Sequence, residues 1–440
     1  MWSVNRSADH LGPGLARVRR ALLLILTGMG LMAGWGRGLA AADPGGGNVW
    51  PQFRGPQQGV CEATGLPRRW QPESGIRWKC AIPGRGHSSP VHNGETIWLT
   101  TAAPDGSELG IASVDAATGQ LLQQWVVFVP ARVEEIHADN SYASPSPVWH
   151  ADRLYVHYGT YGTACLDTAS GEIVWRNTDY HCQHDGGPGS SPVLFENRLI
   201  LTFDGADQQY LVALDSATGQ ELWRRARSAP FRENPTTHRA FSTPLLIETP
   251  TGWQLISPGA DQCHGYDPLT GSELWHVRYV GFSTVPCPAA DAEHVYFCTG
   301  YYKPSLWAVS LSGRGDVTGT HISWKAVGPI PDTPSPLLYQ GRLYTVTNQG
   351  IASCHAAATG ERLWLKRLGG NYSASPLALG GMIYFCSEEG VTHVIDPAAA
   401  APQPVSSRLP GAIKATPAVI GHDLLIRTDQ ALYRITGTND

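Results

Sequence analysis

The sequence has few charged side chains, and no cluster of lysine and arginine occurs after residue 42. Charged residues make up 16% of the 440, and the formal net charge is −5. Proteins that bind nucleic acid neutralise phosphates with clustered cations. We therefore expect no nucleic-acid partner.

The sequence also has no uninterrupted apolar run of the length that a membrane-spanning helix needs. The apolar stretch at residues 21–35 is short, follows three arginines, and is soon interrupted by Arg37. Ala40 and Ala42 then stand at the spacing of an A-x-A cleavage site. This pattern predicts a secretion signal over residues 1–42, with a membrane anchor as the weaker alternative.

Removal of that signal would leave an exported protein with a formal charge of −9 and no integral membrane segment. No cysteine follows the apolar stretch closely enough for lipid attachment. We expect a periplasmic or extracellular protein without a lipid anchor. Residues 43–440 are expected to form one domain, in which residues 50–75 cap the fold.

One phrase recurs along the chain and indicates a repeating fold. It reads LDTASGEIVW at residues 166–175 and returns as VDAATGQLLQQW, LDSATGQELW, YDPLTGSELW and HAAATGERLW. A second phrase, a small residue followed by proline and an apolar residue, precedes each copy, and its eight occurrences lie about 40 to 57 residues apart. Each unit reads as four short strands. The spacing predicts an all-β, eight-bladed β-propeller with four-stranded blades.

The residues of the recurring phrase have architectural reasons to be there. Its aspartate can accept hydrogen bonds from backbone N–H groups further along the turn, and its glycine supplies a positive φ. Its tryptophan is expected to cover the seam between blades and to donate its indole N–H to a backbone carbonyl of the neighbouring blade. We predict structural roles for Asp115, Asp167, Asp215, Asp267, Trp78, Trp125, Trp175, Trp223, Trp275, Trp324 and Trp364.

The ring is predicted to close through its two ends. The eighth unit has only three strands before the chain stops, and residues near Trp78 have no unit of their own. Borrowing that strand would remove an exposed sheet edge. We expect residues 76–82 to pair with residues 431–436. Trp50 and Phe53 are expected to pack on this closing blade, with Arg54 reaching outward.

The repeat resembles that of the pyrroloquinoline quinone (PQQ) propeller superfamily. The segments WPQFRGPQQGV, GTYGTACLD, GPGSSP and LGGNYSASP are similar to exported bacterial propellers called PQQ-binding-like. The resemblance covers residues 50–437, and the superfamily includes quinoprotein dehydrogenases and the propeller lipoprotein that assists outer-membrane protein assembly. The resemblance implies the fold. It does not decide between the function of the dehydrogenases and that of the assembly lipoprotein.

The enzyme branch of that superfamily implies features that this sequence lacks. Quinoprotein dehydrogenases hold the quinone between a tryptophan face and a disulfide of adjacent cysteines, with a Ca²⁺ ion and a catalytic aspartate. The sequence has no Cys-Cys dipeptide. PQQ with Ca²⁺ is therefore not the favoured cofactor, although a PQQ-dependent oxidoreductase stays as an alternative function. We assign no catalytic residue.

Binding residues are expected on the long loops that lead from one blade to the next. These loops converge on one face of a propeller, and loops on a rigid scaffold commonly carry function. The stretch HCQHD at residues 181–185 could bind a transition metal, but its spacing matches no standard zinc site. The candidates are His137, Asp139, Asn140, His181, His184, Asp185, Arg232 and His238.

Three functions follow from these observations. The favoured one is a non-catalytic binding or scaffolding module of the cell envelope, with a protein or envelope component as its partner. The alternatives are the PQQ-dependent oxidoreductase and a metal-dependent enzyme that uses the loop histidines. Of the nine cysteines, Cys61 with Cys80, or Cys263 with Cys287, could form disulfides. His264 is expected to be a surface or packing residue.

Overall fold

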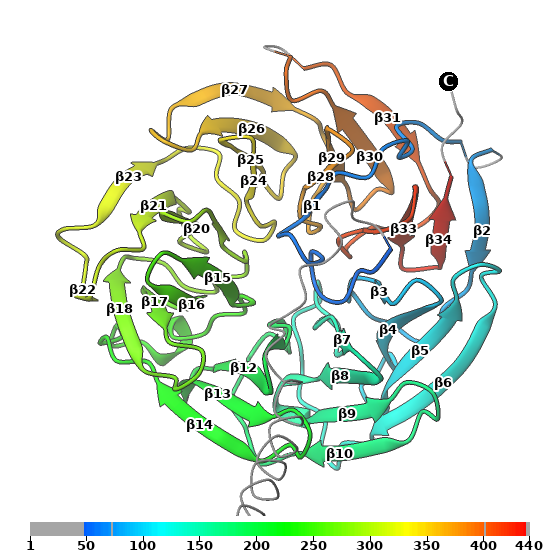
Figure 1. Cartoon of the computed structure of the whole chain (residues 1–440), viewed down its shortest axis with the longest axis horizontal. Helices are drawn as coiled ribbons and strands as arrows, with labels where there is room; N and C mark the ends of the chain where they lie inside the picture. The colour runs from blue at the N-terminus through cyan, green and yellow to red at the C-terminus, as the bar shows by residue number, and fades with distance from the viewer. Residues whose placement is uncertain (1–47, 72–73, 400–401, 437–440) are drawn as a thin grey trace, which may run out of the picture. The chain divides into compact units, whose positions relative to one another are not determined.

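The computed structural model describes residues 48–71, 74–399 and 402–436. The predicted secretion signal lies outside these residues. The described residues form a ring of eight β-sheets around a central axis (Figure 1). The prediction of an all-β, eight-bladed propeller is confirmed.

Each of the first four blades runs from the inner to the outer strand in chain order. The strands of these blades are β3 (Val91–His92), β4 (Thr96–Ala102), β5 (Leu109–Asp115) and β6 (Leu121–Phe128); β7 (Val148–His150), β8 (Arg153–His157), β9 (Thr163–Asp167) and β10 (Ile173–Asn177); β11 (Val193–Phe195), β12 (Arg198–Asp204), β13 (Gln209–Asp215) and β14 (Glu221–Ala226); β15 (Leu245–Thr249), β16 (Gly252–Pro258), β17 (Gln262–Tyr266) and β18 (Glu273–Arg278).

The last four blades follow the same order, except that the outer strand of blade eight comes from the start of the described chain. Their strands are β19 (Ala289–Ala290), β20 (His294–Cys298), β21 (Leu306–Ser310) and β23 (Ile322–Ala326); β24 (Leu337–Tyr339), β25 (Arg342–Val346), β26 (Ile351–Ala356) and β27 (Arg362–Arg367); β28 (Leu377–Leu379), β29 (Met382–Cys386), β30 (Val391–Ile395) and β31 (Val405–Arg408); β32 (Ala418–Ile420), β33 (Asp423–Arg427), β34 (Leu432–Ile435) and β2 (Ile76–Cys80).

Strand β2 closes the ring as predicted. It pairs antiparallel with β34, with Trp78 opposite Arg434. A second contact joins the same two ends, because the His92 Nε2 of blade one lies 2.7 Å from the carbonyl oxygen of Val419 in blade eight. The closure removes the open sheet edges that an incomplete ring would expose.

Two blades carry a fifth strand. Strand β1 (Val60–Cys61) adds in parallel to β28 of blade seven. Strand β22 (Gly315–Asp316) leaves blade five and adds in parallel to β18, the outer strand of blade four. Short 3₁₀ turns, η1 (Gly159–Tyr161) and η2 (Pro235–Thr237), occur in the connections.

The tryptophans of the recurring phrase lie between neighbouring blades. The indole of Trp175 donates to the carbonyl of Ser216 at 2.9 Å, and a Cβ added to Gly219 would lie 2.6 Å from the ring. The same arrangement places the indoles of four other tryptophans against the next blade's glycine, in the pairs Trp78–Gly119, Trp125–Gly171, Trp223–Gly271 and Trp324–Gly360. These glycines have a positive φ, and the tryptophan ring lies where a side chain would otherwise begin. Glycine meets both requirements.

Trp275 differs from the expectation that its indole bonds to a neighbouring blade. Its Nε1 donates to Oε1 of Gln254 in its own blade at 2.8 Å. Blade five lacks the aspartate and glycine of the phrase and extends into β22 instead. Trp364 also differs, because its Nε1 is buried without a hydrogen-bond partner among the described residues.

The aspartates of the phrase organise the turns that precede each outer strand. Asp115 Oδ1 accepts hydrogen bonds from both the backbone N–H and the hydroxyl of Thr118, each at 2.7 Å. Asp167, Asp215 and Asp267 accept equivalent backbone bonds in their own turns. The carboxylate thus satisfies donors that the tight turn leaves without a ladder partner.

A belt of hydroxyl groups joins the inner strands. The backbone N–H of Ser89 donates to Ser146 Oγ of the next blade at 2.8 Å, and Ser146 N–H donates to Ser191 Oγ at 2.9 Å. Equivalent bonds follow from Ser191 to Thr243, Cys287 to Ser335, Ser335 to Ser375 and Ser375 to Thr416. The small residue before each proline is therefore a link between blades.

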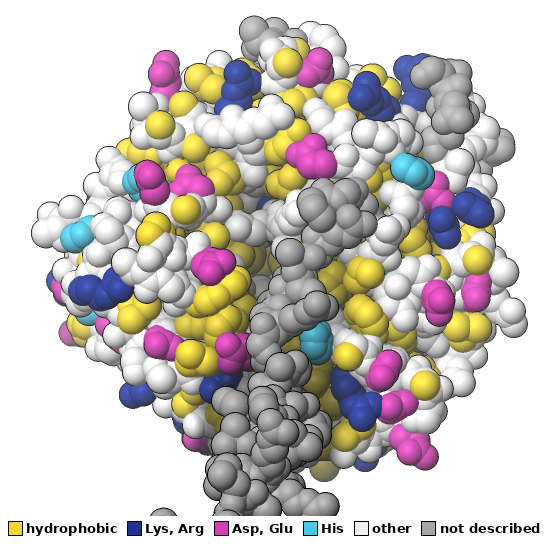
Figure 2. Space-filling model, in the orientation of Figure 1, with side chains coloured by type: hydrophobic (Ala, Val, Ile, Leu, Met, Phe, Trp, Pro, Cys, Tyr) yellow, Lys and Arg dark blue, Asp and Glu magenta, His cyan; other side chains and the backbone are white. Residues whose placement is uncertain are grey.

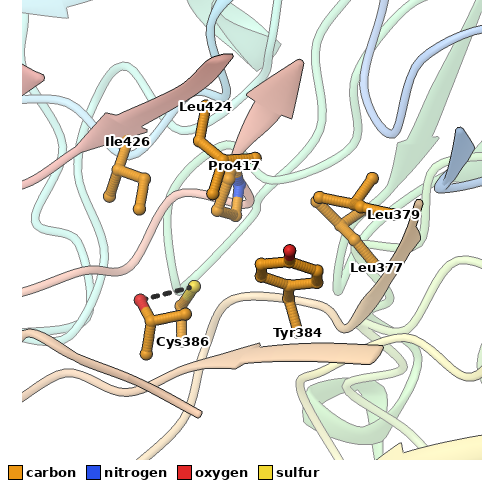
Figure 3. A pocket seen from close by; sticks show the side chains of 8 residues that line it. Leu377, Leu379, Tyr384, Cys386, Pro417, Leu424 and Ile426 are labelled. Atoms are coloured by element: carbon orange, nitrogen blue, oxygen red, sulfur yellow. Dashed lines mark hydrogen bonds between the residues drawn. The ribbon is translucent and has the colours of Figure 1, made fainter. Parts of the chain in front are cut away.

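The hydrophobic core lies between neighbouring blades. Figure 3 shows Leu377, Tyr384 and Cys386 of blade seven facing Leu424 and Ile426 of blade eight. The space among them is too small for a water molecule, so this contact is packing and not a binding site. All nine cysteines are buried and free, and neither of the two disulfides considered from the sequence forms.

The segment that follows Asn48 crosses the ring (Figure 1). Trp50 exchanges backbone hydrogen bonds with His92 of blade one, and Gln58 bonds to the backbone of Ala290 in blade five. Arg54 does not reach outward, because its side chain is buried and donates to the carbonyl of Pro336 in blade six. The segment therefore connects blade one with blades five and six, and its Phe53 lines the central cavity.

No helix among the described residues is long and apolar enough to cross a membrane. On the face seen in Figure 2, basic and acidic side chains are interspersed, without a large patch of one sign.

Candidate functional site

A cavity of about 810 Å³ lies at the centre of the ring. We call it the funnel. The connections between blades form its wall, and Phe53 of the crossing segment contributes to its lining. The size is in the range that accommodates a small ligand or a short polymer segment.

The structure brings four of the eight candidate binding residues into the funnel: His137, Asp139, Asn140 and Asp185. The other four do not line it. His181 contacts Thr160, and His238 Nε2 lies 2.6 Å from the carbonyl oxygen of Arg232. His184 is buried with its ring next to the thiol of Cys182, and Arg232 pairs with Asp261.

The charged groups of the funnel wall pair with one another. The Lys414 ammonium lies 3.5 Å from Glu388 and 3.7 Å from Asp139, so it links blades seven and one. The Arg239 guanidinium lies 3.2 Å from the Asp185 carboxylate. These pairs are partly exposed, so a charged or polar ligand can exchange with either partner at small cost.

Burial, assisted by two nearby cations, keeps His87 neutral. Burial is the main cause that lowers the pKa of His87 to about 3, and the charges of Lys414 and Arg427 add to it. Arg427 is itself buried and donates to the carbonyls of Ser88 and Thr100, without a carboxylate partner among the described residues. Burial lowers its pKa to about 9.

Blade six contributes two oxygen atoms without hydrogen-bond partners among the described residues. They are Asp332 Oδ1 and Asn348 Oδ1, and both residues line the funnel. Burial raises the pKa of Asp332. Buried polar groups are normally satisfied, but both oxygens are covered by neighbouring atoms and are not exposed to the cavity in this structure.

Aromatic side chains complete the lining and continue onto the rim. Phe241, Phe282, Tyr301 and Tyr372 line the cavity. Tyr301 packs edge-to-face on Phe282 with ring centroids 5.6 Å apart and is 50% exposed. Tyr302, next to it, is 77% exposed and has a φ of 92°, which is unusual for a residue with a side chain. Such exposed rings are typical of interaction sites.

The described residues do not fit PQQ. A flat quinone held as in the dehydrogenases needs a tryptophan face and adjacent cysteines. Of the described residues that line the funnel, none is a tryptophan or a cysteine. The tryptophans lie between blades instead. We therefore derive no reaction step through this cofactor.

Several funnel residues were missed, although the sequence carried a signal for them. The residue two positions before each link of the hydroxyl belt faces the cavity, as Lys414 does before Thr416. All eight line the funnel: His87, Ser144, Gly189, Phe241, Val285, Thr333, Ser373 and Lys414. This alternation follows from the period of two in an extended strand.

The fold and the funnel define an eight-bladed propeller with a polar central site. The chain belongs to the family of the outer membrane protein assembly factor BamB, whose model matches residues 69–178, 160–300 and 266–403. This finding confirms a PQQ-repeat propeller related to BamB.

One curated relative of the chain is a subunit of an enzyme. The dehydrogenase subunit of a quinone-dependent alcohol dehydrogenase from Komagataeibacter europaeus is 26% identical over 216 residues, which cover 46% of this chain and 27% of that protein. The chain thus spans about a quarter of the length of this curated relative.

Solved structures share the fold at low sequence identity. BamB from Moraxella catarrhalis matches 82% of this chain and 99% of its own, with a TM-score of 0.57 and 15% identity. A europium-containing methanol dehydrogenase matches 89% of this chain and 91% of its own, with a TM-score of 0.60 and 12% identity. Both likenesses concern the fold alone.

Proposed function

We propose that the protein is an exported, non-catalytic propeller that binds a protein or another envelope component through the funnel and its rim. The observation that carries this proposal is the character of the funnel wall. Its Lys414 and Arg239 form partly exposed pairs with carboxylates, and a ligand with hydrogen-bonding groups can compete for either partner. Such a wall suits a ligand that carries several hydrogen-bonding groups.

The family supports the same proposal. The matching family is described by its role in outer-membrane protein assembly, and a propeller in such a role acts through its surfaces. The exposed rings of Tyr301 and Tyr302 give the rim apolar contact area beside the polar funnel. A chain segment with backbone donors and an occasional apolar side chain fits both features.

Site-specific photo-crosslinking in cells that produce the full-length protein tests this proposal. A photoreactive residue in place of Tyr301 samples the rim, and one in place of Leu222, which is 44% exposed on the outer strand β14, is the matched control. The proposal predicts a discrete adduct from position 301 and none from position 222. Adducts from position 222 alone, or from neither position, would contradict it.

A cofactor assay distinguishes the enzymatic alternative. The purified protein is mixed with PQQ and Ca²⁺, and visible absorbance and dye reduction with alcohols are followed. We expect no dye reduction above that of a heat-denatured sample. Turnover that depends on the folded protein would replace the proposed function with an oxidoreductase.

A further inference from the structure

Two histidines and a carboxylate converge on one face of blade four, away from the funnel. His264 on β17 and His276 on β18 are directly opposite each other in the ladder. Glu273 begins β18, and the register shift between Gly265 and Tyr266 brings it to the same face. Of the described residues, these three are the group whose ligand atoms meet, all within 4.8 Å of one another.

The distances place the glutamate between the histidines. Glu273 Oε1 lies 2.7 Å from His276 Nδ1, and Glu273 Oε2 lies 3.7 Å from His264 Nε2. The side chain of His264 is fully buried, and those of His276 and Glu273 are 17% and 21% exposed. The cluster is therefore sheltered but can be reached from outside.

From this geometry we infer a binding site for a divalent transition-metal cation of the zinc class, with His264, Glu273 and His276 as its protein ligands. Two imidazoles and one carboxylate suit Zn²⁺, whose ligand bonds of about 2.0–2.2 Å require only a modest contraction of this cluster. Ser228 Oγ, at 3.4 Å from His264 Nε2, marks the position of a fourth ligand, either the hydroxyl or a water molecule.

Strand β22 supplies the outer support of this site. Its Asp316 pairs in register with His276, and its carboxylate lies 3.8 Å from His276 Nε2. Histidines that bind a metal through one nitrogen commonly donate the other N–H to a carboxylate, which fixes the ring. The extra strand, contributed by blade five, thus has a positioning role for a ligand on blade four.

Blade three shows that the repeat does not require these residues. The positions that correspond to His264, Glu273 and His276 in the β13–β14 ladder are Val212, Glu221 and Arg224. Glu221 and Arg224 form a partly exposed ion pair there. Blade four therefore carries two histidines where blade three has Val212 and Arg224. Blade three provides matched control variants.

Arg227, a neighbour of His264, limits the affinity of the proposed site for a metal ion. Arg227 Nη1 lies 3.4 Å from His264 Nδ1 and can only donate, so it favours the tautomer that carries the proton on Nε2. If the metal binds Nε2, the proton of the neutral imidazole must move to Nδ1. There it faces the Arg227 N–H, so two donors oppose each other and metal binding is weakened. The Asp204 carboxylate pairs with Arg227 and reduces the charge that the cation meets. We expect micromolar affinity for Zn²⁺.

Titration of the tag-free, chelator-treated protein with Zn²⁺ tests the inference. We expect one equivalent to bind and to raise the thermal unfolding midpoint. His276→Ala and Glu273→Gln should each weaken binding at least ~100-fold, Asp316→Asn about 10-fold, and Arg224→Ala in blade three not at all. Absence of binding, or equal binding by wild type, His276→Ala and Glu273→Gln, would overturn the proposed site.

Co²⁺ gives a second readout that does not depend on stability. Its visible absorption should have the intensity of a tetrahedral complex with nitrogen and oxygen ligands, and this band should disappear in Glu273→Gln. An octahedral spectrum that persists in Glu273→Gln would also overturn the site. Neither readout involves the funnel, so failure here leaves the proposed function unaffected.

Discussion

The indole of Trp175 rests on the Cα of Gly219 in the next blade, while its Nε1 bonds to Ser216 three residues before that glycine. One side chain thus fills the seam, satisfies its own donor and fixes the turn of the neighbouring sheet. Since the contact repeats around the ring, the recurring phrase is best understood as a joint between blades.

The joint can be tested by adding one methyl group. Gly219→Ala places a Cβ 2.6 Å from the Trp175 ring at a φ of 73°. We expect a loss of about 1–2 kcal/mol from the backbone conformation and a further ~1–3 kcal/mol from the contact. Gly341→Ala is the control, because its φ is 71° and its added Cβ meets nothing within 4 Å. Equal losses in denaturant unfolding would rule out a specific contribution of the joint.

The hydroxyl belt makes a separate prediction. Ser146→Ala removes the acceptor of the buried Ser89 N–H, and the unpaired donor should cost about 1–3 kcal/mol. Ser190→Ala is the comparison, because the Ser190 hydroxyl is buried without a partner among the described residues. Its removal should change the free energy of unfolding little. A larger loss in Ser190→Ala than in Ser146→Ala would contradict the assignment of the belt.

A fully buried ion pair supports blade three. Asp204 accepts from Arg227 Nε at 2.7 Å and from Nη2 at 2.6 Å, and both side chains are inaccessible to solvent. Asp204→Ala leaves a buried cation without its anion, so we expect a loss of about 3–5 kcal/mol. Glu221→Gln, which breaks the partly exposed pair with Arg224, should cost about 0–1 kcal/mol. Urea unfolding of both variants measures the difference.

Acid should destabilise the ring through histidines that are buried in the neutral form. Burial lowers the pKa of His92 to about 4, and that of His157 to about 3. Between pH 6.5 and these values the unfolded chain binds protons that the folded chain does not, so stability falls as the pH falls. Each histidine contributes up to ~1.4 kcal/mol per pH unit in that window.

His92→Gln isolates one of these protons. The glutamine amide can still donate to the Val419 carbonyl that His92 contacts, but it does not titrate. Unfolding of the variant should take up about one proton fewer between pH 6.5 and 4. The unfolding free energy should therefore depend less steeply on pH in that range. An unchanged slope would show that His92 does not control the acid response of the closure.

The fold was predictable from the sequence because its joints are local and periodic. Asp215, Gly219 and Trp223 stand at fixed offsets, and the missing strand of blade eight pointed to Trp78. The structure departs from the predicted joint where a blade lacks the residues of the recurring phrase. Blade five lacks the phrase, and Trp275 accordingly turns to Gln254.

The site was harder to predict because it combines residues from connections that are far apart in the chain. Lys414 meets Asp139 across 275 residues, and no local pattern encodes that pairing. His184, from the stretch at residues 181–185 that could bind a transition metal, is buried, and Gly159 leaves room for its ring. His264, expected to be a surface or packing residue, is buried next to Glu273 and His276 because the pairing of β17 with β18 places all three on one face.

The central claim is that partner binding lies in the funnel and not in the recurring phrase. It is tested most directly by the affinity of the purified protein for the partner captured by crosslinking, measured for Lys414→Ala and for Thr118→Ala. Lys414 belongs to the funnel wall, whereas Thr118 is an exposed residue of the phrase in blade one. We predict that Lys414→Ala weakens binding about 10-fold and that Thr118→Ala leaves it unchanged. Weakening by Thr118→Ala with no effect of Lys414→Ala would contradict the account.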